Sequence, residues 1–255
     1  MRNTILAAWV VALAGAAATP PVDAVAPAAS AASGVDPAVA AQRAEKRAVD
    51  AAKLDEAVRL IGTRQPQAAI DRILDPLIAA EDAANAARTE TLYCANSPNE
   101  ALYYMLQAAR DKKSAIALEG TLCNALYMRA FAEVNLGRAD AAEADLTRAV
   151  TLAPSNAHYL SEMGQLQSRK RDWAASLAWF QRAEAASEFS MPNQVKAERG
   201  RALRGIGYVD VELGKLDEAE ASYRRCLEID PHDQKAQAEL GYVQGLKAGQ
   251  AAPAK

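Results

Sequence analysis

Apolar residues recur every three or four positions along most of the chain after residue 36. Such spacing places apolar side chains on one face of a helix. In residues 200–233, one run of this kind ends at Leu213-Gly214 and a second ends at Pro231. The pattern therefore predicts amphipathic helices that are joined in pairs by short turns.

The same pattern returns in residues 123–156, and both stretches are 34 residues long. Each has a Leu-Gly pair that ends the first run, an Ala five residues after that Gly, and a closing Pro. These residues are Leu136, Gly137, Ala142 and Pro154 in one stretch and Leu213, Gly214, Ala219 and Pro231 in the other. A helix–turn–helix unit that repeats at this period predicts a solenoid rather than a compact enzyme domain.

Weaker copies of the unit flank these two stretches. Residues 157–190 follow the pattern with Glu188 in the place of the closing Pro. Pro192, in the short insertion that follows, predicts the start of a long helix. Residues 234–248 predict a lone C-terminal helix, which caps the apolar face of the last pair.

The first part of the helical region, residues 36–122, predicts degenerate helical repeats. Pro37, Pro66 and Pro98 mark helix starts, because Pro is favoured in the first helical turn. Pro76 lies inside an apolar pattern, so we expect a kink or a break there. Residues 89–95 are expected to form a short helix.

These residues resemble the tetratricopeptide repeat family. The pattern of that family requires small residues where the two helices of a pair touch, an aromatic residue between pairs, and a closing Pro. Residues 200–233 supply them as Gly207, Ala219, Tyr223, Cys226 and Pro231. The resemblance implies an all-α fold, a right-handed α-solenoid of helix–turn–helix repeats over residues 123–248 that ends in a capping helix.

The N-terminus has the pattern of an export signal. Arg2 precedes the apolar residues 5–18, which have the length of a signal core and are too short to span a bilayer well. We therefore expect a signal peptide over residues 1–24, cleaved after Ala18 or Ala24, and a periplasmic or secreted protein. An uncleaved N-terminal anchor is the alternative.

The rest of the chain fits an exported interaction protein. We predict a disordered linker over residues 25–35 and a frayed tail over residues 249–255. No other apolar run is long enough to span a membrane, so no membrane span is expected after cleavage. The 29 basic and 32 acidic residues nearly balance, which argues against a nucleic-acid partner. The oligomeric state is left open.

Three cysteines, Cys94, Cys123 and Cys226, offer limited chemistry. In an oxidising compartment two of them can form a disulfide. A Cys94–Cys123 bridge and free thiols are both open at this stage. Cys226 takes the place of a small packing residue, so we expect a buried thiol. No C-x-x-C motif is present, which argues against thiol-redox chemistry and a zinc ribbon.

Catalytic and metal-binding patterns are missing from the sequence. His158 and His232 are the only histidines, and neither belongs to a cluster with metal-ligand spacing. The chain has no Gly-rich phosphate loop, no G-x-S-x-G and no H-E-x-x-H. We therefore expect no enzyme activity, no metal and no cofactor.

The resemblance also implies where a partner binds, because in this family the first helix of each repeat lines a concave groove. The side chains at those positions mix amides, aromatic rings and Arg, which suits an extended peptide. The expected groove residues are Asn124, Tyr127, Phe131, Asn135, His158, Gln165, Arg169, Arg201, Arg204, Tyr208 and Tyr242.

Two features of this groove are expected in more detail. Arg201 and Arg204 are expected to face solvent and to receive an acidic group. Tyr127 and Phe131 stand where some relatives have a Lys and an Asn that hold a C-terminal carboxylate, so that clamp is not expected. The alternative for Tyr127, Phe131 and Tyr208 is that they only pack between neighbouring helices.

Three functional hypotheses follow. The first is a non-enzymatic adaptor of the bacterial cell envelope that binds a protein or peptide partner in the groove, since residues 92–214 resemble exported bacterial repeat proteins of unassigned role. The second is a structural subunit of an envelope complex that docks through the convex face or the N-terminal helices. The third is a hydrolase or redox enzyme that uses Cys94 or Cys123.

Overall fold

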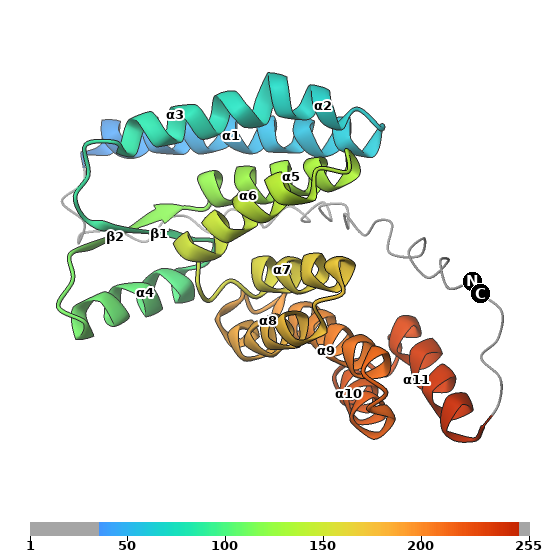
Figure 1. The fold of residues 1–255 in the computed structure, drawn as a ribbon. Coiled ribbons are helices and arrows are strands. Elements are labelled where there is room, and N and C mark those ends of the chain that lie inside the picture. Colours follow the sequence, from blue (N-terminus) through green and yellow to red (C-terminus); the bar gives the residue numbers. More distant parts are fainter. Residues whose placement is uncertain (1–35, 250–255) are drawn as a thin grey trace, which may run out of the picture.

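The computed structural model describes residues 36–249, and helices dominate this part of the chain (Figure 1). A hairpin of long helices comes first, a small β–α–β unit follows, and a stack of helix pairs completes the chain (Figure 1). The expected signal peptide, the linker and nearly all of the tail lie outside the described residues. Within residues 36–249, no helix combines the length and apolarity needed to cross a bilayer.

The stack of helix pairs agrees with the repeat pattern. Neighbouring helices of the stack pack against one another in chain order. The bounds are α5 Thr121–Asn135, α6 Ala139–Leu152, α7 Ala157–Lys170, α8 Trp173–Ala186, α9 Val195–Glu212, α10 Leu216–Ile229 and α11 Gln234–Lys247. The predicted all-α solenoid with a C-terminal helix is thus confirmed in its main part.

Local chemistry fixes the ends of these helices. Asn156 caps α7 by accepting a hydrogen bond from the backbone N–H of Tyr159 at 3.1 Å, and Asp233 caps α11 by accepting one from Ala236 at 3.0 Å. Such caps satisfy N–H groups that have no partner inside the helix. Gly137 and Gly214 follow the first helices of their pairs with φ of 75° and 73°, a conformation that Gly adopts without steric cost.

Small residues and aromatic rings meet inside the pairs. A Cβ at Gly207 would lie 2.7 Å from the ring of Tyr223, and a Cβ at Gly164 would lie 3.0 Å from the ring of Phe180. Both rings are almost fully buried. The Gly positions therefore let α9 approach α10, and α7 approach α8, closely enough to bury an aromatic ring.

The N-terminal hairpin pairs α1, Pro37–Gly62, with a second helical stretch that α2, Pro66–Ala69, begins. That stretch passes through the π-helical segment Ile70–Leu74 into α3, Asp75–Asn85. The interruption lies directly before Pro76, where the sequence predicted a kink or a break. Pro cannot donate an α-helical hydrogen bond, and the π-helical turn accommodates this loss.

A β–α–β unit stands where helical repeats were expected. The short helix predicted over residues 89–95 is wrong, because Thr91–Ala95 forms strand β1. β1 pairs in parallel with β2, Ala115–Glu119, and α4, Pro98–Arg110, connects the two strands. Parallel strands need a crossover of this kind. The strand depends on pairing with a segment about 20 residues away, which local helical periodicity does not reveal.

The insertion before α9 forms a turn where the start of a helix was predicted. The long helix was expected to begin at Pro192, but α9 begins at Val195. Met191 accepts backbone hydrogen bonds from Gln194 at 2.7 Å and from Val195 at 3.1 Å, so a turn precedes the helix. Pro192 thus lies within the turn.

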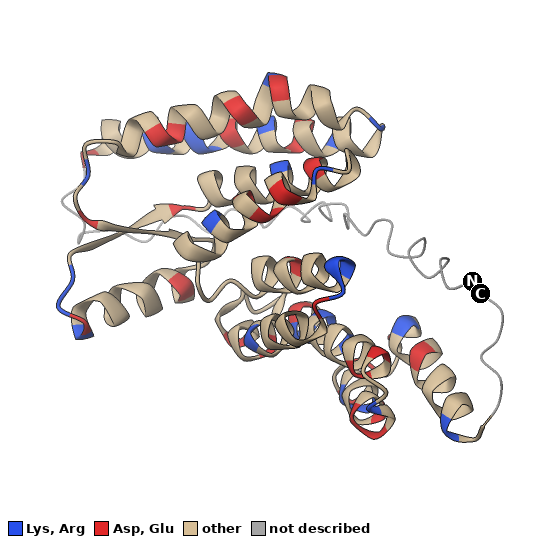
Figure 2. Cartoon of the chain, viewed as in Figure 1, with Lys and Arg blue, Asp and Glu red and all other residues tan. Residues whose placement is uncertain are grey.

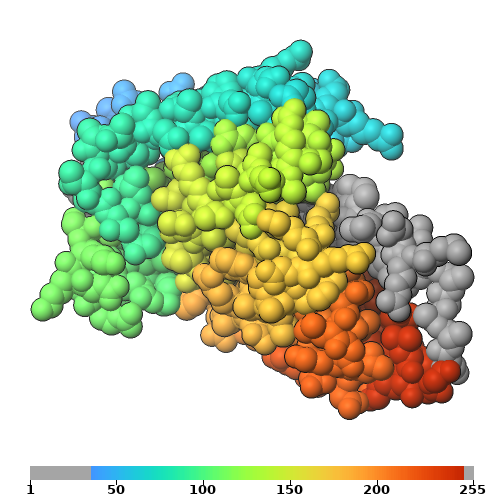
Figure 3. Space-filling model, viewed as in Figure 1, coloured from blue at the N-terminus to red at the C-terminus, as the bar shows by residue number. Residues whose placement is uncertain are grey.

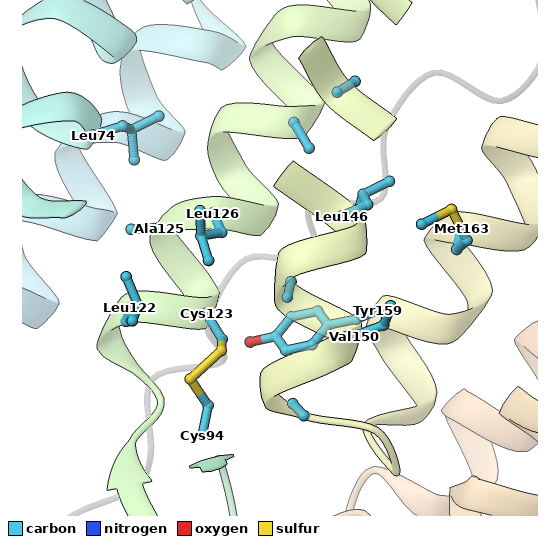
Figure 4. Packing of buried hydrophobic residues seen from close by; sticks show 14 of the residues in the cluster. Leu74, Cys94, Leu122, Cys123, Ala125, Leu126, Leu146, Val150, Tyr159 and Met163 are labelled. Carbon is cyan, nitrogen blue, oxygen red and sulfur yellow. A yellow bond between two sulfur atoms is a disulfide. The ribbon is translucent and has the colours of Figure 1, made fainter. Parts of the chain in front are cut away.

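Cys94 of β1 and Cys123 of α5 are joined by a disulfide (Figure 4). Both residues are almost fully buried, and the bond lies in the main hydrophobic core beside Leu122 and Tyr159 (Figure 4). It connects residues 29 positions apart. The bond therefore fastens the β–α–β unit to the first helix of the stack.

Candidate functional site

The first helices of the pairs meet through a ring contact between α5 and α7. The ring of Tyr127 in α5 packs edge-on against His158 in α7, with 4.7 Å between the ring centroids. It also lies 5.9 Å from the ring of Tyr159. Tyr127 is half-buried, and burial raises its pKa above the ordinary value. The hydroxyl is therefore a neutral hydrogen-bonding group at physiological pH.

An ionic cluster lies beside this ring contact and joins α7 to α9. The imidazole Nδ1 of His158 is 3.4 Å from Glu198 Oε1. Arg201 lies between two carboxylates, with Nη1 3.5 Å from Glu162 and Nε 3.4 Å from Glu198. We call His158, Glu162, Glu198 and Arg201 the α7–α9 cluster.

The electrostatics of the cluster favour an ionised Glu198. Burial by itself opposes ionisation, since the side chain is only 12 % exposed. The hydrogen bond and charge of His158, together with the charge of Arg201, outweigh burial and lower the pKa of Glu198 below its ordinary value. The carboxylate thus holds the N-terminal turns of α9 against α7.

The two arginines of the expected groove do not face solvent freely, so that expectation is wrong. Arg201 is paired within the α7–α9 cluster and is 29 % exposed. Arg204 is 18 % exposed and forms an ion pair with Asp233, the residue that caps α11. Their internal carboxylate partners were not recognised from sequence. An acidic ligand would have to compete with carboxylates that are already in place.

Asn124 has an internal role as well. The hydroxyl of Tyr159 donates to its Oδ1 at 2.7 Å, and its Nδ2 donates to Asn96 Oδ1 at 3.4 Å. Asn96 in turn donates to the Tyr159 hydroxyl oxygen at 2.9 Å. This network joins the end of β1 to α5 and α7, so Asn124 stabilises the fold in addition to lying at an expected groove position.

The other expected groove residues are spread along the same helices. Phe131 and Tyr208 are half-buried and pack against the hydrophobic cores, with the Tyr208 ring edge-on to Trp173 at 6.2 Å. Asn135 is exposed and donates to the Phe131 carbonyl at 3.0 Å. Arg169 is exposed at the end of α7.

Two further positions complete the set. Gln165 is half-buried and donates to Glu162 at 3.4 Å. Tyr242 is half-buried on α11. The structure therefore brings together Tyr127, His158, Gln165 and Arg201, whereas the others lie elsewhere along the helices.

Sequence reasoning missed Glu162 and Glu198. Glu162 follows His158 by four residues and Glu198 precedes Arg201 by three, and both spacings place two side chains on one helix face. Glu198 lies before the repeat that begins at residue 200, so only the extension of α9 brings it opposite His158. The helical spacing within α7 was the available signal.

Other chemistry is limited in the part of the chain that the structure describes. Basic and acidic residues are interspersed along the helices (Figure 2). Among residues 36–249, no group of three His, Cys, Asp or Glu side chains is placed to hold a metal ion. The thiol of Cys226 is buried, which raises its pKa to about 12. A thiol with such a pKa is a poor nucleophile at neutral pH.

Comparisons with known proteins address the fold. Residues 124–156 and 201–233 match the family model described as tetratricopeptide repeat. One similar solved structure is the first such domain of Spaghetti (RPAP3) bound to the HSP90 peptide SRMEEVD, with 21 % identity and a TM-score of 0.45 over 51 % of this chain and 99 % of that chain. Another is the first such domain of human RPAP3, with 21 % identity and a TM-score of 0.44 over 50 % and 93 %. A comparison with curated proteins gives no match.

The family match falls on the two stretches that the repeat pattern singled out. The chain therefore carries tetratricopeptide repeats, and the resemblance that the sequence indicated is confirmed. Repeats of this family are modules that bind proteins and peptides, and they are typically non-catalytic.

Proposed function

We propose that the chain is a non-enzymatic adaptor of the bacterial cell envelope that binds a protein or peptide along α5, α7 and α9. The observation that carries this proposal is the continuous contact from Tyr127 through His158 to Arg201, which unites three successive first helices. Tyr and Arg side chains in well-packed surroundings are enriched among binding hot spots.

The paired arginines restrict the chemistry of the ligand. Arg201 and Arg204 already have carboxylate partners, so the strongest contacts of the ligand are made elsewhere. We assign them to the ring of Tyr127 and to the exposed side chains of Asn135 and Arg169. An extended peptide suits these groups, because it offers both apolar side chains and backbone hydrogen-bonding groups.

Export supports the same proposal. The charged start at Arg2 and the apolar residues 5–18 have the pattern of a cleaved signal, and a buried disulfide suits an oxidising compartment. We therefore place the adaptor in the periplasm or outside the cell. A mature N-terminus near Thr19 or Val25, read by N-terminal sequencing of the protein from its host, supports export, and an intact N-terminus in the cytoplasm contradicts it.

Site-specific photo-crosslinking in the host cell tests the binding surface. A photoreactive residue is placed at exposed first-helix positions, Asn135 or Arg169, and at exposed second-helix positions, Gln181 or Glu228. The proposal predicts crosslinks to one protein from the first-helix positions and not from the matched second-helix positions. The reverse pattern would assign the partner to the other face.

A structural role through the N-terminal helices is the second candidate, and one observation favours it. Residues 37–49, the first half of α1, are exposed throughout, and they include Val39 at 38 % and Val49 at 48 % exposure. A helical segment that is exposed on every side within residues 36–249 is suited to docking against another subunit. Crosslinks from Val39 in place of Asn135 would support this candidate.

A further inference from the structure

The outer edge of the small sheet has backbone groups that are free to pair. Thr91 N donates to Ser114 O at 2.9 Å, and Thr91 is in register with Ala115. In a parallel pair, alternate residues of a strand point their N–H and C=O groups to the partner. Ala115, Ala117 and Glu119 therefore point theirs away from β1, and no third strand among residues 36–249 pairs with them.

β2 is the outer strand of the pair. β1 contacts α5 and α6 and is fastened to α5 by the disulfide of Cys94, and α4 packs against both strands. In the space-filling view, this green part of the chain forms one end of the visible face (Figure 3). An exposed strand edge is a template for pairing with another chain, and a sheet of two strands is marginally stable alone.

The edge of β2 is complementary to itself. When a second copy of β2 is placed antiparallel with Ala117 opposite Ala117, Ala115 of one copy lies opposite Glu119 of the other. These residues are the ones with outward N–H and C=O groups, so each outward group gains a hydrogen bond in the narrow pairs of an antiparallel ladder. A shift of one residue loses this match.

The side chains agree with the same register. Ile116 of one copy lies opposite Leu118 of the other, and both residues are half-buried in the single chain, so an apolar cross-strand pair forms. Lys113 of one copy lies diagonal to Glu119 of the other, within reach of a long side chain. Lys113 is exposed, and Glu119 is 52 % exposed although it lies 3.4 Å from Arg47.

We propose that the edge of β2 binds a second copy of this chain, so that the two sheets join as β1–β2–β2–β1. The two-fold axis is perpendicular to the joined sheet and passes between the two Ala117 residues, where only methyl groups meet. It places both α4 helices, with Leu102 and Leu106 each 61 % exposed, on the same face. Such a dimer presents two partner-binding surfaces, which raises avidity for a partner with two sites.

Charge exchange in the purified exported chain tests this register by sedimentation equilibrium. Lys113→Glu and Glu119→Lys each place like charges at both diagonal contacts, so each variant is expected to raise the dimer dissociation constant about tenfold. An equimolar mixture of the two variants is expected to regain the parent affinity, because each copy then meets the opposite charge twice. Lys196→Glu, which reverses the charge of an exposed side chain on α9, is the control that matches Lys113→Glu. It is expected to leave the dimer dissociation constant unchanged.

Four results would overturn the proposal. The first is a parent chain that stays monomeric up to about 100 μM, a concentration at which even a weak specific dimer is populated. The second is a parent chain that dimerises while neither charge variant differs from the Lys196→Glu control. The third is a mixture that shows no recovery, which would mean that Lys113 and Glu119 do not face each other across copies. Capture of an unrelated extended peptide by a monomer at this edge would likewise contradict the second copy.

Discussion

Gly207 lies so close to the ring of Tyr223 that a Cβ at this position would be 2.7 Å from the ring. The contact joins the small and aromatic positions of one repeat, and it explains why α9 and α10 pack with a fully buried Tyr between them. The repeat pattern predicted Gly207 at the contact between the two helices of this pair, but it placed the aromatic residue between pairs. The ring of Tyr223 lies inside the pair instead, so the contact supports the predicted position of Gly207 and corrects that of the ring.

Gly207→Ala is expected to destabilise the fold by about 1–3 kcal/mol, because the added methyl overpacks against the buried ring. Gly241→Ala is the matched control. Nothing lies within 4 Å of a Cβ at Gly241 in α11, and Ala is favoured over Gly inside a helix by up to about 1 kcal/mol. Urea unfolding measures both. Equal effects of the two changes would contradict the assigned packing.

Loss of the Cys94–Cys123 disulfide is expected to lower the free energy of unfolding by about 2–4 kcal/mol, since the bond closes a loop between residues 29 positions apart. The double change Cys94→Ala and Cys123→Ala tests this by chemical denaturation. Thiol titration provides a check: unfolded, unreduced protein should show the single thiol of Cys226. Three free thiols would rule out the bridge.

Arg201→Glu is expected to destabilise the fold by about 1–3 kcal/mol, a range reduced because the side chain is partly exposed. The change places a third carboxylate among Glu162 and Glu198 and removes the cation that they share. Arg169→Glu, on the exposed end of α7, is the control and is expected to stay within about 0.5 kcal/mol of the parent. If Arg201→Glu leaves the free energy of unfolding unchanged, the α7–α9 cluster contributes nothing to stability.

The lowered pKa of Glu198 predicts a pH dependence. The folded state binds the proton of this carboxyl more weakly than the unfolded state does. The stabilisation that ionised Glu198 provides is therefore fully present above the ordinary pKa of 4.5, and it is lost as the pH falls through the lowered pKa of the folded state. The gap in unfolding free energy between parent and Glu198→Gln should therefore shrink from about pH 6 to about pH 3. A difference in unfolding free energy between parent and Glu198→Gln that does not change with pH would show that the pKa of Glu198 is not lowered by folding.

The repeats could be predicted from sequence because their signals are local. Leu213-Gly214, Ala219 and Pro231 mark a turn, a contact and a helix end within one unit, and the helices α9 and α10 follow from them. The strand Thr91–Ala95 could not be predicted in the same way, because it depends on pairing with Ala115–Glu119 across a helix.

The candidate site shows the same limit. Helical positions assigned both Tyr127 and His158 to the expected groove, and their rings lie in contact. They did not reveal that Arg204 is paired with Asp233, because the partner lies in another helix pair. Whether a charged side chain is free depends on contacts between elements, which one helix face does not determine.

The central claim is that a partner binds along α5, α7 and α9. Binding calorimetry with the purified partner that photo-crosslinking identifies tests this claim most directly. Tyr127→Ala, in a variant shown to be folded by circular dichroism, should weaken binding by about 1–2 kcal/mol if the ring is a hot spot. Val39→Ala, a change of exposed apolar area on α1, should leave the affinity unchanged. Unchanged affinity for Tyr127→Ala together with a loss for Val39→Ala would contradict the account and place recognition on the N-terminal helices.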